Sequence, residues 1–397
     1  MATIRRMKHR SNRLSAAVVV AIGSASLAAA MGIGRFAFTP LMPLMQEAFG
    51  LTLTQGAWLA TANYLGYFVG AMSNFVLHPR AGPSACWGLL AVAIATAAMG
   101  STSAFAPWFV LRLVAGIGSA FVLVGASSWA LAHLAANSRP QGSGSVFSGV
   151  GVGLLVAGVV ALVAGIIQAD PAHVWFLLGG LCAAVAAAAW RPLSVATATV
   201  QAQEAHGAPA LERSEWTLVA CYGIFGFGYI IPATFIPAAA RTLVNDPAVF
   251  GWAWPVFGLA AAASTVAVSA LFRTTSPRRV AAWSLVVMAV GVIAPLIQMS
   301  LASLAVSALC VGGTFMVMTM AGVQEARRIV VGSPTKLIAA LTAAFAVGQI
   351  AGPVVVGLGQ ASGSAVALSS GLAVTLLLMS AGVLLFTDAR AARVATP

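Results

Sequence analysis

The chain has 397 residues, of which 60% are hydrophobic and only 7% are charged, and its mean hydropathy is +0.97. This composition excludes a water-soluble domain and predicts a protein whose solvent is lipid. The formal net charge of +12 does not indicate nucleic-acid binding, because the basic residues stand singly or in twos and threes between apolar stretches.

Apolar stretches of about 20 residues predict transmembrane helices, since backbone polar groups in hydrocarbon must be hydrogen-bonded within their own segment. Twelve such stretches follow one another: 16–45, 55–77, 84–104, 106–130, 145–168, 173–190, 215–240, 248–272, 280–298, 300–322, 337–359 and 364–387. The sequence therefore predicts an all-α integral membrane protein with twelve transmembrane helices.

The lysines and arginines give this topology an orientation. With the N-terminus placed in the cytoplasm, seventeen of the twenty fall in cytoplasmic segments, Arg241 falls outside, and Arg35 and Arg112 lie within spans. The positive-inside rule thus predicts a bacterial-type inner membrane protein with both termini cytoplasmic. A cleaved signal peptide is the alternative for the basic start, but its removal would leave eleven spans and reverse the loops.

The chain divides into two halves. The long polar stretch inside it, 191–214, predicts a cytoplasmic linker between an N-terminal half, 1–190, and a C-terminal half, 215–397. Two patterns recur in the same order at offsets of 194 and 199: Gly32, Gly34, Arg35 and Pro43 match Gly226, Gly228, Tyr229 and Pro237, and Gly149, Gly153 and Gly158 match Gly348, Gly352 and Gly357. Two parallel six-helix repeats are one known plan for secondary transporters.

Four motifs stand out along the chain: the run from Gly32 to Pro43, the Gly312–Met316 segment, the Gly348–Pro353 segment, and Arg112 followed by Gly116 and Gly118. They resemble motifs of the major facilitator superfamily, and within it of the YbfB/YjiJ-type transporters. The resemblance covers nearly the whole chain and implies the major facilitator fold, with spans 16–45, 106–130, 215–240 and 300–322 around a central cavity. The segment from Gly70 to Pro79 departs from the superfamily's usual acidic and basic pattern.

Arg35 and Arg112 are the main candidates for substrate contacts. A charged side chain inside a span is unfavourable unless it faces the protein interior. All eight acidic residues fall in loops or at helix ends, so neither arginine has an obvious buried partner. We therefore expect a positive cavity that favours anionic or polar organic substrates. The alternative for Arg35 is that it reaches the outer headgroups or bonds carbonyls freed by Pro40 and Pro43.

Uncharged residues complete the expected cavity. If the family fold applies, Tyr229 and Thr314 face the same space as the arginines, with Phe36 as an apolar wall. Asn63 and Gln349 offer further hydrogen bonds, although interhelical bonding is an equally good explanation for the polar residues of this set.

A second set of residues predicts close helix packing. Small residues at spacings of four and five let helices approach each other. We expect the glycines of 145–168 and 337–359, together with Pro353, to form sliding contacts between the halves. The conformational set is Gly116, Gly118, Gly149, Gly153, Gly158, Gly348, Gly352, Pro353 and Gly357.

The predicted function is alternating-access transport of a small molecule by a secondary transporter. No Walker, Rossmann, metal-ligand or catalytic pattern occurs, so we expect no enzyme activity, no cofactor and no metal. The expected partners are a small-molecule substrate, membrane lipid and a coupling ion that no residue can be assigned to, and the protein is expected to be a monomer. The alternative is a non-transporting receptor or sensor on the same fold.

Overall fold

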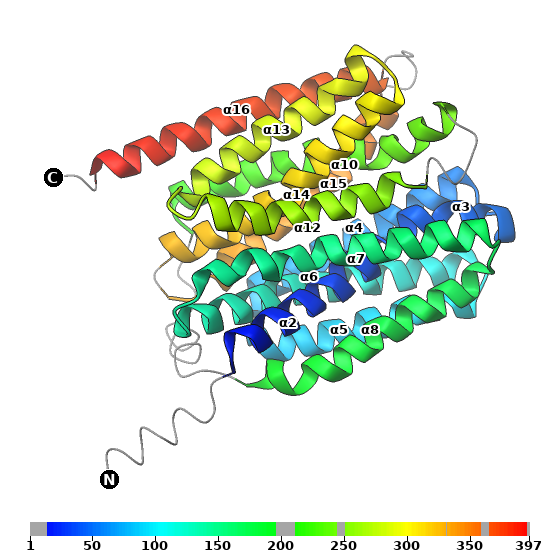
Figure 1. The fold of residues 1–397 in the computed structure, drawn as a ribbon, viewed down its shortest axis with the longest axis horizontal. Helices are drawn as coiled ribbons and strands as arrows, with labels where there is room; N and C mark the ends of the chain where they lie inside the picture. Colours follow the sequence, from blue (N-terminus) through cyan, green and yellow to red (C-terminus); the bar gives the residue numbers. More distant parts are fainter. Residues whose placement is uncertain (1–13, 196–210, 244–250, 331, 359–364, 395–397) are drawn as a thin grey trace, which may run out of the picture.

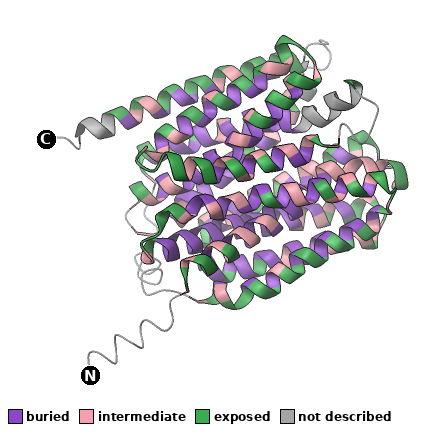
Figure 2. Ribbon diagram, viewed as in Figure 1, coloured by how far each residue is buried: buried purple, intermediate pink, exposed green. Residues whose placement is uncertain are grey.

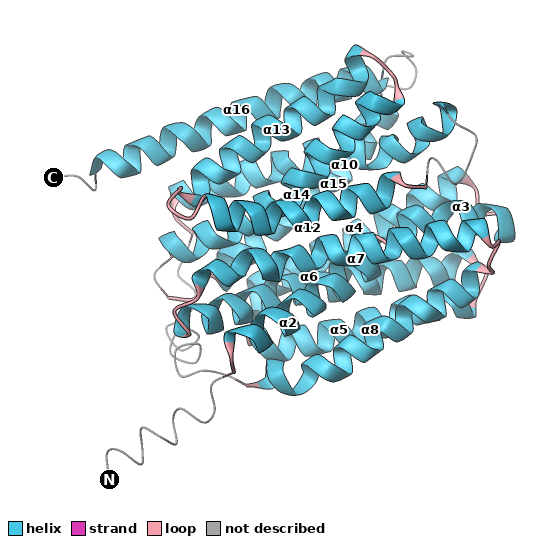
Figure 3. Ribbon diagram, viewed as in Figure 1, coloured by secondary structure: helices cyan, strands magenta, loops and turns pink. Residues whose placement is uncertain are grey.

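The computed structural model describes residues 14–195, 211–243, 251–330, 332–358 and 365–394, and within these it leaves out the side-chain surroundings of 234–242, 356–358, 365 and 390–394. The described part is helical throughout, with short loops between the helices and no strand (Figure 3).

All twelve predicted spans are helical in the described part of the chain. The first is divided into α2 (Ala16–Leu27), the π-helix η1 (Ala28–Arg35) and α3 (Phe38–Phe49). The others are α4 (Leu53–Leu77), α5 (Ala81–Ala98), α6 (Phe105–Ala136), α7 (Ser143–Ile166), α8 (Pro171–Ser194), α10 (Arg213–Leu243), α12 (Ala253–Leu271), α13 (Pro277–Ile297), α14 (Leu301–Ile329), α15 (Thr335–Leu358) and α16 (Ala365–Val394).

Eleven of these spans are long and apolar enough to cross a membrane by length and composition, and α4 is the exception. Its polar residues include Asn63 and Asn74, both of which are fully buried. Because α4 packs between α6 and α15, these amides face protein rather than lipid, which relaxes the need for an apolar sequence.

The twelve spans form two groups of six. In Figure 1 the first six, coloured blue to green, lie in the lower part of the view and the last six in the upper part. The groups meet where α7 packs on α12 and where α4 packs on α15. The start of α2 and the end of α16 lie at the same end of the bundle (Figure 1). We call this the basic end, because α4, α8 and α14 also end here and carry Arg80, Arg191 and Arg328 at or just after their last turns. We call the other the opposite end.

Exposed tryptophans mark both rims of the bundle. Trp58 and Trp252, at the opposite end, are 56% and 55% exposed, and Trp87 and Trp283, towards the basic end, are 64% and 60% exposed. Tryptophan is enriched at both membrane interfaces, so these residues delimit the hydrocarbon region between them. Each pair occupies corresponding helices of the two repeats. Figure 2 shows the outward faces of the peripheral helices α8 and α16 as exposed, as lipid-facing surfaces are.

Three glycines of α7 form the seam with α12. A Cβ added at Gly144 would lie 2.5 Å from the carbonyl oxygen of Thr265, one at Gly151 would lie 2.6 Å from that of Gly258, and one at Gly158 would meet Pro255 at 2.8 Å. These residues recur every seven positions, which places them on one helix face. The seam therefore runs along most of the helix length with the two backbones almost in contact.

The prediction that Gly149, Gly153 and Gly158 together contact the other half is wrong for Gly149 and Gly153. Cβ atoms at Gly149 and Gly153 would meet backbone atoms of Ser24 and Ala28 at 2.0 and 2.3 Å, in the first span of the same repeat. A four-residue step and a five-residue step along a helix turn by different amounts, so the three glycines do not share one narrow face.

The matching glycines of the second repeat behave in the same way. Gly348 lies against Gly223 and Gly352 against Ile230, both in α10. These contacts hold each repeat together rather than joining the two. Pro353 lies inside α15, and Gly357 falls outside the residues whose side-chain surroundings are described.

We predict that Gly153→Ala destabilises the protein by about 1–3 kcal/mol, because the new methyl group must displace the backbone of the first span. Gly180→Ala is the matched control, since a Cβ at Gly180 meets nothing within 4 Å. Thermal unfolding of the purified protein in detergent measures both. Equal melting temperatures for the two variants would contradict the contact.

Candidate functional site

The site is organised by the break in the first span. Phe36 donates its N–H to the carbonyl of Met31, five residues back, and Thr39 bonds the carbonyl of Phe36 rather than that of Arg35. Pro40 explains this shift, because it has no N–H with which to bond Phe36. The usual hydrogen-bond ladder is thereby interrupted, and the Arg35 carbonyl is left without its usual donor, Thr39.

Side chains from neighbouring helices bond the carbonyls around the break. Arg112 of α6 donates from Nη1 to the Gly34 oxygen at 3.1 Å and from Nη2 to the Arg35 oxygen at 2.8 Å. Ser119, two turns further along α6, donates to the Ala30 oxygen at 2.8 Å. Helix breaks in hydrocarbon need such partners. The carbonyl-bonding role that the sequence allowed for Arg35 therefore belongs to Arg112.

Close helix approach makes these bonds possible. Cβ atoms at Gly32 and Gly34 would lie 2.4 Å from Gly153 Cα and 2.3 Å from a methyl group of Val92, so larger residues would push the broken segment away. Gly116 likewise admits the backbone of Asn63, at 2.2 Å from where its Cβ would be, and Asn63 donates its amide to the Arg112 carbonyl at 3.0 Å. Gly118 packs in the same manner against Gly88 of α5.

The Arg35 guanidinium reaches the middle of the bundle. It lies 3.5 Å from the ring centroid of Tyr67 and donates from Nη2 to the Gln349 side-chain oxygen. Tyr67 is the fifteenth of 25 residues in α4, and Gln349 is the fifteenth of 24 in α15. Because these helices enter from opposite ends, the charge sits near the midplane, deeper than the outer half expected from the sequence.

This cation has few partners. Arg35 is 1% exposed, and none of the ion pairs between described residues involves it. Its Nε and Nη1 atoms have no hydrogen-bond acceptor, and the Nε2 atom of Gln349 is also unpaired. The rings of Tyr64, Phe36 and Phe345 lie 5.3–5.9 Å from the guanidinium and supply cation–π attraction. Three buried donors therefore converge without an acceptor.

Aromatic rings from both repeats form one wall of this centre. Tyr229 stacks on Phe315 with centroids 4.4 Å apart, and Phe36 meets Phe315 edge-on at 5.7 Å. A void beside Phe315 measures only about 10 Å³, which is about the minimum for one water molecule. It is lined by Met31, Tyr67, Leu123, Tyr222, Phe315, Thr319, Thr342 and Phe345. The centre is closed in this structure.

The structure brings four of the seven cavity candidates together: Arg35, Phe36, Tyr229 and Gln349. Asn63 bonds the backbone of Arg112, and Thr314 donates to the Cys310 carbonyl of its own helix at 2.6 Å. Tyr67, Phe315 and Phe345 complete the site but were missed. Tyr67 follows Asn63 by one helical turn, a spacing that could have identified it.

An ion cluster lies at the basic end of the second repeat. Glu325 accepts from Arg278 at 2.5 Å and from Arg328 at 2.7 Å, and Asp388 accepts from Arg279 at 2.8 Å. It ties α13, α14 and α16 together. The acidic residues of the first repeat, Glu47 and Asp170, stand near the ends of α3 and α7, away from this cluster, so among the described residues the ion pairs at this end belong to the second repeat alone.

Twelve helices in two repeats around a closed polar centre define a membrane protein of the major facilitator fold. The profile of the family described as uncharacterised MFS-type transporter YbfB matches residues 27–385. The chain therefore belongs to this family of major facilitator superfamily transporters, and family and fold together point to a transporter rather than an enzyme.

Individual relatives agree with this assignment. The uncharacterized MFS-type transporter YceJ of Bacillus subtilis (strain 168) is 30% identical over 94 residues, a stretch that spans 23% of this chain and 24% of that relative. The human organic anion transporter MFSD10 (TETRAN) superposes with a TM-score of 0.69 at 15% identity, covering 94% of this chain and all of that one. FucP in its outward conformation gives 0.68 at 12% identity, with 92% and 98% covered.

We predict different effects on stability for substitutions of the two buried arginines. Arg112→Met removes two charge-assisted bonds to backbone carbonyls and should lower the free energy of unfolding by about 3 kcal/mol. Arg35→Met removes a buried charge with two unmade hydrogen bonds and should not lower the melting temperature. Thermal unfolding in detergent compares them, and an equal loss in both variants would contradict the division of roles.

Proposed function

We propose that this chain is a secondary transporter that carries a small organic anion across the membrane by alternating access. In this proposal Arg35 contacts the anionic group and Gln349 donates a further hydrogen bond. Arg112 acts as a positioning residue, since both of its Nη atoms are committed to the backbone. The basic end faces the cytoplasm, as the positive-inside rule indicates.

The observation that carries this proposal is the convergence of unpaired donors at the centre. Arg35 Nε, Arg35 Nη1 and Gln349 Nε2 all offer hydrogens, and a buried donor without an acceptor is unfavourable by about 1–3 kcal/mol or more for a charged group. A carboxylate supplies acceptor oxygens and a negative charge at once. A neutral or cationic substrate would leave the guanidinium uncompensated.

The surrounding rings indicate the rest of the substrate. Phe36, Tyr229, Phe315 and Phe345 pack against one another, and Phe315 and Phe345 line the small void, so an apolar or aromatic body next to the anionic group would find matching surfaces. The similarity in fold to a human protein titled an organic anion transporter points in the same direction.

The closed centre supports alternating access. Arg35 is 1% exposed and the void beside its partner Tyr67 measures only about 10 Å³, so the two repeats would have to separate before a substrate could reach Arg35. The bond between Arg35 and Gln349 joins the first repeat to the second and must break in that step. The glycine seam between α7 and α12 lets the halves 1–190 and 215–397 rock on each other, with 191–214 as the connection.

We predict that Arg35→Gln lowers uptake of organic anions into proteoliposomes by at least tenfold, because loss of one charge-assisted bond of about 1.5–3 kcal/mol corresponds to such a factor. The screen compares small carboxylates, sugars and neutral drugs, with and without a pH gradient. Flux itself separates a transporter from a receptor on the same fold.

Arg191→Gln is the control for this experiment, since it removes the same charge from an exposed position at the end of α8. Its flux should equal that of the wild type. A wild-type protein that transports only neutral compounds, or an Arg35→Gln variant with unchanged anion flux, would overturn the proposal.

A further inference from the structure

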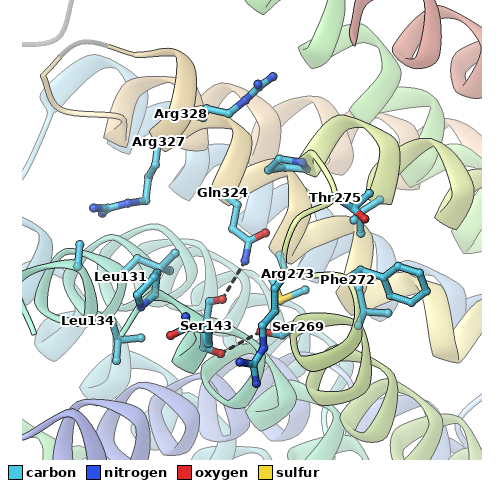
Figure 4. Close-up of a pocket in the computed structure, with 17 residues that line it drawn as sticks. Leu131, Leu134, Ser143, Ser269, Phe272, Arg273, Thr275, Gln324, Arg327 and Arg328 are labelled. Carbon is cyan, nitrogen blue, oxygen red and sulfur yellow. Dashed lines mark hydrogen bonds between the residues drawn. The ribbon is translucent and has the colours of Figure 1, made fainter. Parts of the chain in front are cut away.

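A second cavity lies between the two repeats at the basic end, far from Arg35. It has a volume of about 420 Å³, within the range of small-molecule sites, and we call it the basic pocket (Figure 4). Its lining comes from the ends of α6, α12 and α14 and the starts of α7 and α13: Leu131, Leu134, Ala135, Pro140, Gln141, Ser143, Val268, Ser269, Phe272, Arg273, Thr275, Pro277, Val280, Met320, Gln324, Arg327 and Arg328.

Both repeats contribute hydrogen-bonding groups to this pocket. Gln324 donates its amide to the Ser143 hydroxyl at 2.8 Å, and Ser269 donates to the Gln141 carbonyl at 2.9 Å. Each bond joins the second repeat to the first. A ligand seated here would touch both repeats and would stabilise the arrangement in which they meet at this end.

The charge of the lining is positive and incompletely balanced. Three arginines line the pocket and no acidic residue does. Arg328 is engaged by Glu325, and Figure 4 shows its side chain directed away from the other labelled residues. Arg273 and Arg327 have no acidic partner among the described residues, and Arg273, in the turn after α12, donates from Nε to the Ala270 carbonyl in the last turn of that helix. Arg327 is partly buried, so water screens its charge incompletely.

Part of the pocket lining is apolar. Leu131 and Leu134 come from α6, Phe272 and Val268 from α12 and its following loop, and Met320 from α14. The positive-inside rule alone would explain basic residues at this end, but it would not explain a cavity beside them that is partly lined by apolar side chains. The combination suits an anionic group carried on an apolar or neutral body.

We propose that the basic pocket binds a phosphate-bearing anion, with Arg273 and Arg327 supplying the uncompensated positive charge of its lining, and that occupancy favours contact between the repeats at this end. Guanidinium groups match the geometry of phosphate oxygens. The phosphate can belong to the head of an anionic lipid or to a soluble phosphate compound. Arg327 follows Phe315 by twelve residues in α14, about 18 Å along the axis, so this site is separate from the centre.

Thermal unfolding of the full-length protein in detergent tests the proposal with three probes: inorganic phosphate, short-chain phosphatidylglycerol and short-chain phosphatidylcholine. An anionic probe should raise the melting temperature of the wild type and of Arg35→Gln, whereas phosphatidylcholine should not. Arg327→Gln and Arg273→Gln should weaken the apparent affinity at least fivefold. Arg80→Gln, an equal charge change at an exposed position of the same end, should keep it.

The three probes distinguish a lipid headgroup from a soluble phosphate. A shift with phosphatidylglycerol alone identifies a lipid head as the ligand, and an equal shift with inorganic phosphate identifies a soluble phosphate. No preference for the anionic probes, or equal affinities in Arg327→Gln, Arg273→Gln and Arg80→Gln, would overturn the proposal. Because Arg35→Gln keeps this binding, the result is independent of whether the transport proposal fails.

Discussion

The structure depends on how the backbone carbonyls at the break in the first span find hydrogen-bond donors inside the hydrocarbon region. Lipid offers no hydrogen bonds, so carbonyls released by the π-helix and by Pro40 need partners from other helices. Arg112 and Ser119 supply them from α6. This requirement fixes α6 against the break, and the glycines around it let α4, α5 and α7 pack closely enough to enclose the same point.

Enclosure of the break has a consequence for Arg35. The residue stands at the last position of the π-helix, where the interrupted ladder turns its side chain across the bundle towards the second repeat. Two arginines thus lie close together in different surroundings: Arg112 donates hydrogen bonds to two backbone carbonyls, and Arg35 stacks on Tyr67 with unpaired donors. The protein itself satisfies the first arginine, and the proposed anion would compensate the second.

The sequence predicted the twelve helices and the repeats because hydropathy, charge asymmetry and recurring glycines are local signals along the chain. Of its cavity candidates, the structure places Arg35, Phe36, Tyr229 and Gln349 together, and their contact with substrate stays a prediction. The sequence could not separate the roles of Arg35 and Arg112, because that difference depends on which carbonyls the π-helix exposes. The glycine faces were partly wrong for a related reason. Gly144, Gly151 and Gly158 face α12, whereas Gly149 and Gly153 face the first span, and only the rotation of α7 decides between them.

The central claim is that the unpaired donors at Arg35 select a negative charge, and ligand-induced thermal stabilisation tests it most directly. The measurement compares organic carboxylates with their own uncharged amides on the wild type and on Arg35→Gln. Our account predicts that at least one carboxylate stabilises the wild type, that its amide does not, and that the difference disappears in the variant. Equal stabilisation by an acid and its amide, or a preference for the acid that survives in Arg35→Gln, would contradict it.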